Sequence, residues 1–101
     1  MLNLSKLKGF EWDQANIDKN WKRHKVYWRE CEEVFINLPL LASLDKIHSP
    51  QEIRFRVLGK TNDNRKMFIV FTVRNNKIRI ISARDQSRKE KEIYGKVKKT
   101  I

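Results

Sequence analysis

The sequence predicts an α+β fold with two N-terminal helices, a central antiparallel sheet of three to four strands and a basic C-terminal helix. Three observations carry this prediction. Apolar residues recur with helical spacing in the first third of the chain, they follow strand-like patterns between residues 52 and 83, and a helix-capping pattern comes directly afterwards. The 101 residues contain no repeat and no linker rich in Gly, Ser or Pro, so residues 1–101 are expected to form a single domain.

The first helix is expected over residues 14–23. Asp13 is a good N-cap, and Ile17, Trp21 and His24 recur at positions i, i+4 and i+7. This spacing places the three side chains on one face of the helix, and we expect that face to pack against the core.

Two further helices are expected. One spans residues 28–36 and is ended by Pro39, which cannot continue a helix. The other begins at the S-x-x-E capping box of Ser87 and Glu90 and runs to about residue 98. The residues expected to face inward are Cys31, Val34 and Phe35 in the first of these helices, and Ile93 and Val97 in the second.

Three antiparallel strands are expected over residues 52–57, 67–73 and 78–83. The first alternates polar and apolar residues, and the other two are rich in β-branched and apolar residues. Asn75–Asn76 links the last two strands, and because both residues tolerate positive φ, this link predicts a type I′ hairpin turn. A short alternation over residues 9–12 predicts an additional edge strand.

The register of the sheet follows from burial, because a shift of one residue moves every side chain of a strand to the other face. A loop of odd length between the first two strands pairs Phe55 with Phe71, and the Asn turn pairs Thr72 with Arg79. Arg54 then lies beside Thr72, so Arg54 and Arg79 share the face opposite the core. The residues expected on the apolar face are Ile53, Phe55, Val57, Ile69, Phe71, Val73, Ile78 and Ile80.

The charge of the chain favours a polyanionic partner, with nucleic acid first. Lys and Arg number 23 against 12 Asp and Glu, which gives a net charge of +11. The single cysteine, Cys31, excludes an intramolecular disulfide and fits a reducing, cytoplasmic setting. The sequence shows no signal peptide, membrane-spanning segment, zinc-ligand spacing or glycine-rich phosphate loop, so we expect no metal, no cofactor and no membrane contact.

Arginines on the polar sheet face are the first candidates for chemistry. Arg54 and Arg79 would repel each other unless an anion joins them, and Arg84 follows as a third convergent cation. Arg54 and Arg79 either bind a phosphate group or pair with Glu52 or the C-terminal helix. Glu52 is either a general base toward a ribose hydroxyl or the ion-pair partner of a neighbouring arginine or lysine.

His24 and the tryptophans each allow two interpretations. His24, between Arg23 and Lys25, is a candidate base or neutral donor, but its phase on the apolar stripe is equally that of a packed core residue. Of the three tryptophans, we expect only Trp12 to be exposed, where it could stack a nucleobase, and the other two to be buried.

The order and spacing of several segments over roughly residues 10–95 identify a family resemblance. The strongest is Ile78–Arg84, which reads Ile-Arg-Ile-Ile-Ser-Ala-Arg. The other segments are Phe10–Asp13, Asn20–Val26, Glu30, Val34–Phe35, Asp45, His48–Ser49, Glu52–Phe55, Glu90 and Tyr94. Together they resemble the BrnT toxins of bacterial type II toxin–antitoxin modules. The chain departs from that family at Arg23–Lys25, where the family tends to read Lys-His-Gly, and at Asn37–Pro39, which replaces Asp-Pro.

The resemblance implies a RelE-like small α+β endoribonuclease. It also implies a BrnA-like antitoxin with a ribbon-helix-helix part, and a toxin–antitoxin hetero-oligomer that binds operator DNA through the antitoxin. Two sets of candidate residues, for catalysis and for RNA binding, follow from the positions that match the family and from the predicted cationic surface. The catalytic candidates are His24, Glu52, Arg54, Arg79 and Arg84, and the RNA-binding candidates are Trp12, Arg23, Lys25, Arg56 and Arg88.

Without a metal-ligand set, RNA cleavage would use the substrate's own 2′-hydroxyl as nucleophile and leave a 2′,3′-cyclic phosphate and a 5′-hydroxyl. The arginines would stabilise the extra charge of the transition state, while Glu52 or His24 takes or gives the proton. Two other functions stay open: a non-catalytic nucleic-acid-binding module, and a partner of an antitoxin without activity of its own. Incubation of the chain with RNA in EDTA separates the three.

Overall fold

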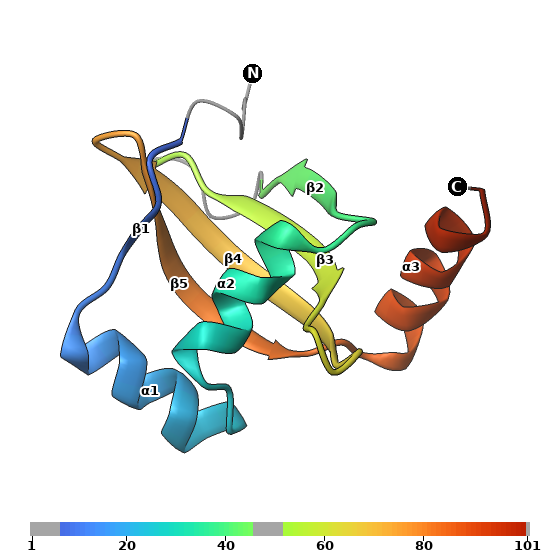
Figure 1. Cartoon of the computed structure of the whole chain (residues 1–101), viewed down its shortest axis with the longest axis horizontal. Coiled ribbons are helices and arrows are strands. Elements are labelled where there is room, and N and C mark those ends of the chain that lie inside the picture. The colour runs from blue at the N-terminus through green and yellow to red at the C-terminus, as the bar shows by residue number, and fades with distance from the viewer. Residues whose placement is uncertain (1–6, 46–51, 101) are drawn as a thin grey trace.

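The computed structural model describes residues 7–45 and 52–100 and has an α+β fold, as predicted (Figure 1). Helix α2 covers one face of the sheet, α1 lies along the edge at β5, and α3 lies at the other side of the molecule, beyond β3 and β2 (Figure 1). The elements in chain order are β1 (Phe10–Glu11), α1 (Gln14–His24), α2 (Trp28–Ile36), β2 (Leu41–Leu44), β3 (Phe55–Lys60), β4 (Lys66–Arg74), β5 (Lys77–Asp85) and α3 (Arg88–Thr100).

The sheet differs from the expected antiparallel sheet of three to four strands. It has five strands in the order β1-β5-β4-β3-β2, and β1 runs parallel to β5. The prediction missed β2, because its four residues follow Pro39 in a continuous apolar stretch that shows no alternation. The first long strand begins at Phe55, not at residue 52, and continues to Lys60. Both edge strands are short, so their pattern in the sequence is weak.

The predicted register of the first hairpin is confirmed. Phe55 pairs with Phe71 and Val57 pairs with Ile69 across β3 and β4. Burial decides this register, since Val57, Ile69 and Phe71 then lie on one face of the sheet. Ile53 lies before β3 and is 60% exposed, so its expected place on the apolar face is wrong.

The second hairpin turns at Asn75–Asn76, whose φ angles of 53° and 62° are the positive values that a type I′ turn needs. Thr72 pairs with Arg79 as expected. An irregularity between Val70 and Phe71 then shifts the register for the rest of β4 and β5. This bulge increases the local twist of the sheet between its two halves.

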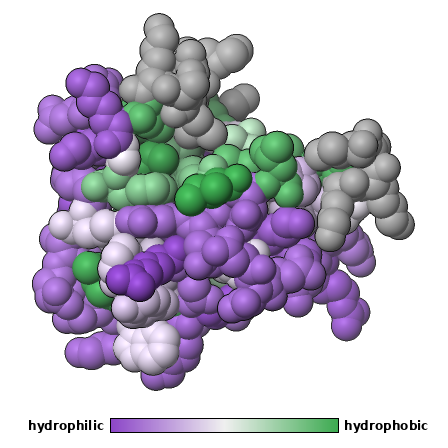
Figure 2. Space-filling model, viewed as in Figure 1, coloured by the Kyte–Doolittle hydropathy of each residue, from purple (hydrophilic) through white to green (hydrophobic). Residues whose placement is uncertain are grey.

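The hydrophobic core lies between the sheet and α2. Residue burial alternates along β4 and β5, so that one face of the sheet packs against the helix. The buried core residues are Val26, Cys31, Val34, Val57, Met67, Ile69, Phe71, Ile78, Ile80 and Ala83. In the view that shows α2 in front of the sheet, the surface is hydrophilic over α1 and apolar in a band near the end of α2, where Ile36 and Leu38 are exposed (Figure 2).

Helix α1 is rotated relative to the prediction from its apolar stripe. Asn20 is its buried residue, whereas Trp21 is 48% exposed and His24 is also exposed. The expectation that His24 packs in the core is therefore wrong, and so is the expectation that Trp21 is buried. Hydrophobicity alone does not set the phase of this helix, because polar contacts at the sheet edge also fix it.

Those contacts protect β5 where β1 ends. The Asn16 side-chain amide donates a hydrogen bond to the carbonyl of Ile80, and Lys19 Nζ donates one of 2.6 Å to the carbonyl of Ile81. Two side chains of α1 thus satisfy strand carbonyls that β1 is too short to reach. The same contacts place the N-terminal half of α1 beside β5.

Helix α3 begins with the predicted capping box. The backbone amide of Ser87 donates to Glu90 Oε1 at 2.8 Å, and the amide of Glu90 donates to Ser87 Oγ at 3.2 Å. Tyr94 is the residue that anchors the helix, since it is 1% exposed and its hydroxyl donates to the carbonyl of Pro39 at 2.6 Å. The expectation that Ile93 faces inward is wrong, because 43% of it is exposed.

Candidate functional site

The sheet face turned away from α2 is called the open face here. Side chains alternate along a strand, so the neighbours of the buried core residues point to this side. The register aligns Thr72 with Arg79 and Phe68 with Arg84 across it. The residues of the open face are Arg54, Arg56, Leu58, Phe68, Val70, Thr72, Arg79, Ser82 and Arg84.

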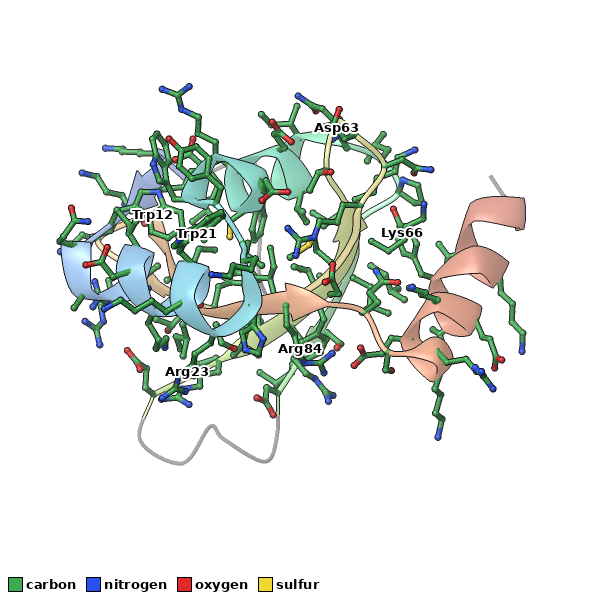
Figure 3. All side chains as sticks on the ribbon, turned by 90° about the horizontal axis from the view of Figure 1, so that it is seen from below. Trp12, Trp21, Arg23, Asp63, Lys66 and Arg84 are labelled. Carbon is green, nitrogen blue, oxygen red and sulfur yellow. The ribbon has the colours of Figure 1, made fainter. Side chains whose placement is uncertain are left out.

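Helix α1 borders the open face along β5. In Figure 3, Arg23 of α1 and Arg84 of β5 point to the same side of the molecule, whereas Trp12 and Asp63 lie on the side of α2. Two predicted cations from separate elements therefore lie at one surface.

An open depression of about 380 Å³ lies on this face, next to the start of α1. It brings together Glu52, Arg54 and Arg79, as the register predicts. Four basic side chains and two carboxylates line it, so its charge is positive with acidic groups placed among the cations. The lining residues are Asp13, Ala15, Asn16, Lys19, Glu52, Arg54, Thr72, Arg74, Arg79, Ile80 and Ile81.

Arg79 is held in place by two carboxylates. Its Nη2 donates to Asp13 Oδ2 at 2.5 Å, and its Nη1 donates to Glu11 Oε1 at 3.1 Å. The hydrogen bond to Asp13 is the main cause that raises the pKa of Arg79. The pKa of Asp13 is lowered, first by the backbone amide of Asn16 and then by Arg79. Arg79 is thus a charged group with a fixed orientation at the wall of the depression.

Glu52 pairs with Arg74, which is the ion-pair interpretation of this residue. Arg74 Nε and Nη2 donate to the same oxygen, Glu52 Oε1, at 3.0 and 2.7 Å. Thr72 is 2% exposed, and its hydroxyl donates to the carbonyl of Ile53 at 2.7 Å. This buried bond holds the segment before β3 against β4, and so places Glu52 and Arg54 beside the depression.

Arg84 does not join Arg54 and Arg79 in the depression. Its Nη1 and Nη2 donate to the two carboxylate oxygens of Glu90 at 2.8 and 3.0 Å, and its guanidinium carbon lies 4.1 Å from the ring centroid of Phe68. The expectation of a third convergent cation is therefore wrong. Arg84 pairs instead with Glu90 of the C-terminal helix.

The residues Arg23, His24 and Lys25 lie exposed at the C-terminal end of α1, outside the depression. Arg65 fixes this end of the helix, since its guanidinium donates to the carbonyls of His24 and Lys25 at 3.1 and 2.9 Å. Lys25 has a left-handed φ of 55°, and its Nζ lies 5.2 Å from the ring centroid of Trp21. The carbonyl of His24 is thus held by Arg65, and its exposed side chain is not part of the core.

The remaining RNA-binding candidates are spread over the surface. Trp12 is half-buried on the side of α2, where its Nε1 donates to Glu32 at 2.9 Å. Trp21, not Trp12, is the more exposed tryptophan. Arg56 lies on the open face, with Nη2 at 3.5 Å from the carbonyl of Leu44, and Arg88 is exposed at the start of α3.

Three charged residues of the depression are not among the candidates: Asp13, Lys19 and Arg74. A signal for Lys19 exists in the sequence, because it lies at i+4 from Ala15 and i+3 from Asn16, on the helix face that the structure turns toward β5. That signal becomes readable only when the phase of α1 is known. Asp13 was recognised only as a helix cap.

The described residues contain no cluster of three or more His, Cys, Asp or Glu side chains that could hold a metal ion. The cysteine is no candidate for chemistry, because burial raises the pKa of the Cys31 thiol to about 12. Within the same residues, no helix has the length and apolar character needed to cross a membrane.

The fold and the open face define a small basic α+β protein with a cationic depression suited to a polyanion. Comparison with protein families supports the resemblance seen in the sequence. The family model of BrnT, described as the ribonuclease toxin of a type II toxin–antitoxin system, matches residues 12–90, and the chain belongs to this family. A search among curated proteins finds no match. As a toxin of a type II system, the chain has an antitoxin as its partner.

Proposed function

We propose that the chain is a metal-independent endoribonuclease whose active site is the depression at Glu52, Arg54 and Arg79. The observation that supports this most is the joint placement of a carboxylate and two guanidinium groups at one open depression. Lys19 adds a further cation from α1. A phosphodiester needs cations for its charge, and its neighbouring 2′-hydroxyl needs a proton acceptor.

In the proposed reaction, the 2′-oxygen of the RNA attacks the adjacent phosphorus, and the bond from phosphorus to the 5′-oxygen breaks. The 2′-hydroxyl proton passes to a carboxylate oxygen of Glu52, and the leaving 5′-oxygen takes a proton from water. The products are a 2′,3′-cyclic phosphate and a 5′-hydroxyl. Arg54 and Arg79 stabilise the additional negative charge of the pentacoordinate transition state. Because Glu11 and Asp13 already orient Arg79, little reorganisation is needed when the charge develops.

Glu52 is a better candidate for the base than His24. Glu52 lines the depression with both arginines, and Arg74 holds one of its two carboxylate oxygens. His24 is exposed at the C-terminal end of α1, outside the depression. A general base must reach the proton that it removes, so geometry favours the carboxylate.

The antitoxin is proposed to be BrnA-like, with a ribbon-helix-helix part through which a hetero-oligomer binds operator DNA in the cytoplasm. We place its neutralising segment on the open face or on α3, whose exposed cations include Arg88, Lys89 and Lys91. An acidic segment there would compete with RNA for the same charges.

The proposed function is tested with labelled single-stranded RNA in the presence of EDTA. We expect cleavage to persist, with 2′,3′-cyclic phosphate ends, in the wild type and in His24→Ala. Glu52→Gln, which keeps an acceptor for Arg74, is expected to lose cleavage. Cleavage that EDTA abolishes and Mg²⁺ restores contradicts the metal-independent mechanism. Full activity in Glu52→Gln contradicts its role as the base, and RNA binding without cleavage in the wild type identifies a non-catalytic binding module.

A further inference from the structure

The guanidinium of Arg84 lies over the ring of Phe68 on the open face. Its guanidinium carbon is 4.1 Å from the ring centroid, and its two terminal nitrogens form a bidentate pair with Glu90. Nη1 also donates to the carbonyl of Asp85 at 3.0 Å. Glu90 is itself fixed, because its Oε1 accepts the backbone amide of Ser87. The guanidinium plane therefore has a defined orientation, and protein acceptors occupy its outer edge.

Part of the Arg84 side chain stays accessible to a ligand. The side chain is 37% exposed, although the Phe68 ring covers one face of the guanidinium and Glu90 covers its edge. With Phe68 on one side and Glu90 at the terminal nitrogens, we take the exposed part to include the side of the guanidinium away from the ring. Nη1 of Arg84 donates to both Glu90 and the carbonyl of Asp85, whereas Nη1 and Nη2 of Arg79 each donate to one carboxylate oxygen, so Arg84 keeps fewer N–H groups for a phosphate than Arg79 does. A guanidinium plane stacked on an aromatic ring is, however, a suitable platform for a nucleobase.

The distance to the depression fits one RNA strand. Arg84 pairs with Phe68, and Arg79 pairs with Thr72, four residues further along β4. At about 3.3 Å per residue, the two arginines lie about 13 Å apart along the sheet. A stacked nucleic-acid strand advances about 3.4 Å per nucleotide, and an extended strand advances further. A base within about four nucleotides of the scissile phosphate can therefore reach the platform.

We infer that Phe68 and Arg84 form a base-stacking subsite for an unpaired nucleobase of single-stranded RNA. The position of this base relative to the scissile phosphate rests on the function proposed above. Stacking tolerates any base, because each has a π face, so the subsite selects for unpaired strand and not for sequence. Arg84 is then a binding residue of the RNA strand and does not stabilise the transition state.

The test measures binding of a short single-stranded RNA with 2′-O-methyl riboses, which cannot be cleaved through its 2′-oxygen. An abasic unit replaces each nucleotide in turn. In the wild type, we expect one position within about four nucleotides of the best-bound phosphate to weaken binding roughly tenfold or more when abasic. Arg84→Ala should weaken binding of the intact RNA by a similar factor, and the abasic unit should then cost nothing further. If Arg84→Ala and the abasic unit weaken RNA binding independently, so that the two losses add, the proposed subsite is contradicted.

Three variants separate stacking from charge and from folding. Arg84→Lys keeps the charge and the pair with Glu90 but loses the plane, so it is expected to bind as weakly as Arg84→Ala. Phe68→Leu removes the supporting ring and should reduce the abasic effect. Arg29→Ala removes one exposed cation from α2, where Arg29 lies over the Trp28 ring, and should keep the full abasic effect. Wild-type binding by Arg84→Lys overturns the inference in favour of a purely electrostatic contact.

Failure of this inference differs from failure of the proposed function. The binding test needs no cleavage, so a wild type that shows the abasic effect without any ribonuclease activity keeps the subsite and refutes the enzyme. A wild type that cleaves RNA but binds every abasic RNA equally well keeps the enzyme and refutes the subsite.

Discussion

The carboxylate of Asp13 joins the start of helix α1 to the guanidinium of Arg79. One of its oxygens caps the helix by accepting the backbone amide of Asn16 at 2.8 Å, and the other accepts Arg79 Nη2 at 2.5 Å. One side chain therefore sets both the position of α1, which carries Lys19, and the orientation of the arginine proposed to meet the phosphate. Helix placement and site geometry are coupled at this residue.

Asp13→Asn tests this coupling through pH. The pKa of Asp13 is lowered by the Asn16 amide and by Arg79, so the ionised carboxylate stabilises the fold above its ordinary pKa, and this stabilisation is lost as pH falls through the lowered value. Asn keeps the helix cap but cannot ionise. The free energy of unfolding, measured in urea between about pH 5 and pH 2, should therefore fall less steeply in Asp13→Asn. Asp18→Asn removes a carboxylate from the same helix and is the matched control; equal slopes in both variants would contradict the role of the Arg79 pair.

Arg79→Ala tests the cation of the proposed site. Loss of one preorganised group that stabilises transition-state charge reduces turnover by roughly 10²–10³-fold, and we expect a decrease of that size in kcat. Single-turnover cleavage of RNA measures it, with circular dichroism to verify that the variant is folded. Arg29→Ala removes the same charge from α2, where Arg29 lies over the Trp28 ring, and should keep wild-type turnover. An unchanged kcat in Arg79→Ala would make Arg79 a structural partner of Asp13 alone.

Replacement of each of two glycines by alanine is expected to change the stability of the fold in opposite directions. A Cβ at Gly59 in β3 would lie 2.6 Å from Val34 Cγ1 and 3.2 Å from Leu40 Cδ1, so Gly59→Ala should destabilise the fold by about 1–3 kcal/mol. A Cβ at Gly95 in α3 would meet nothing within 4 Å, so Gly95→Ala should stabilise it by about 0.5–1 kcal/mol through the lower flexibility of alanine. Urea denaturation of the two variants measures both effects. If the two variants are equally stable, the side chains of Val34 and Leu40 move aside for the Cβ at position 59 without loss of stability.

Neutralisation by the antitoxin predicts competition with RNA. If an acidic segment of the antitoxin covers the open face, it displaces labelled RNA from an inactive Glu52→Gln protein. RNA binding should weaken steeply with salt, by roughly 0.7 counterions per phosphate contacted, and the antitoxin should show a similar trend because it pairs with the same cations. The measurement is a displacement titration at two salt concentrations. A ternary complex in which RNA stays bound would place the antitoxin elsewhere on the molecule.

The parts of the fold that local rules determine could be predicted from the sequence. Alternation and burial gave the pairing of Phe55 with Phe71, and two adjacent asparagines gave the turn before β5. The capping box of Ser87 and Glu90 likewise needs only residues three apart. From the first two of these features the shared face of Arg54 and Arg79 followed, and with it the position of the depression.

The partners of the charged residues could not be predicted, because they depend on contacts between distant segments. Arg79 meets Asp13, which lies 66 residues earlier in the chain, and the bond exists only because β1 adds to the sheet in parallel beside β5. Lys19 enters the site because it bonds a carbonyl of β5. Apolar periodicity points Trp21 inward, but these polar contacts turn α1 so that Trp21 is exposed.

The same rotation of α1 buries Asn20 and yields a prediction for stability. Asn20 is 2% exposed, and its Nδ2 and Oδ1 are buried without a hydrogen-bond partner among the described residues. Burying such groups costs about 1–3 kcal/mol, and Asn is also a weaker helix former than Ala or Leu. Asn20→Ala removes both polar atoms without adding volume, and Asn20→Leu also adds apolar contact next to the buried Val26.

We expect Asn20→Leu to raise the free energy of unfolding by about 1–2 kcal/mol, since the removed polar atoms gain nothing in the folded state. Each kcal/mol corresponds to a rise in Tm of roughly 4–8 °C for a domain of this size. Asn20→Ala should be neutral or slightly stabilising, because the cavity it leaves offsets part of the gain. Thermal and urea unfolding measure both variants. A loss of more than about 1 kcal/mol in Asn20→Ala would mean that the amide makes a stabilising hydrogen bond, for example to a buried water, and that α1 depends on it.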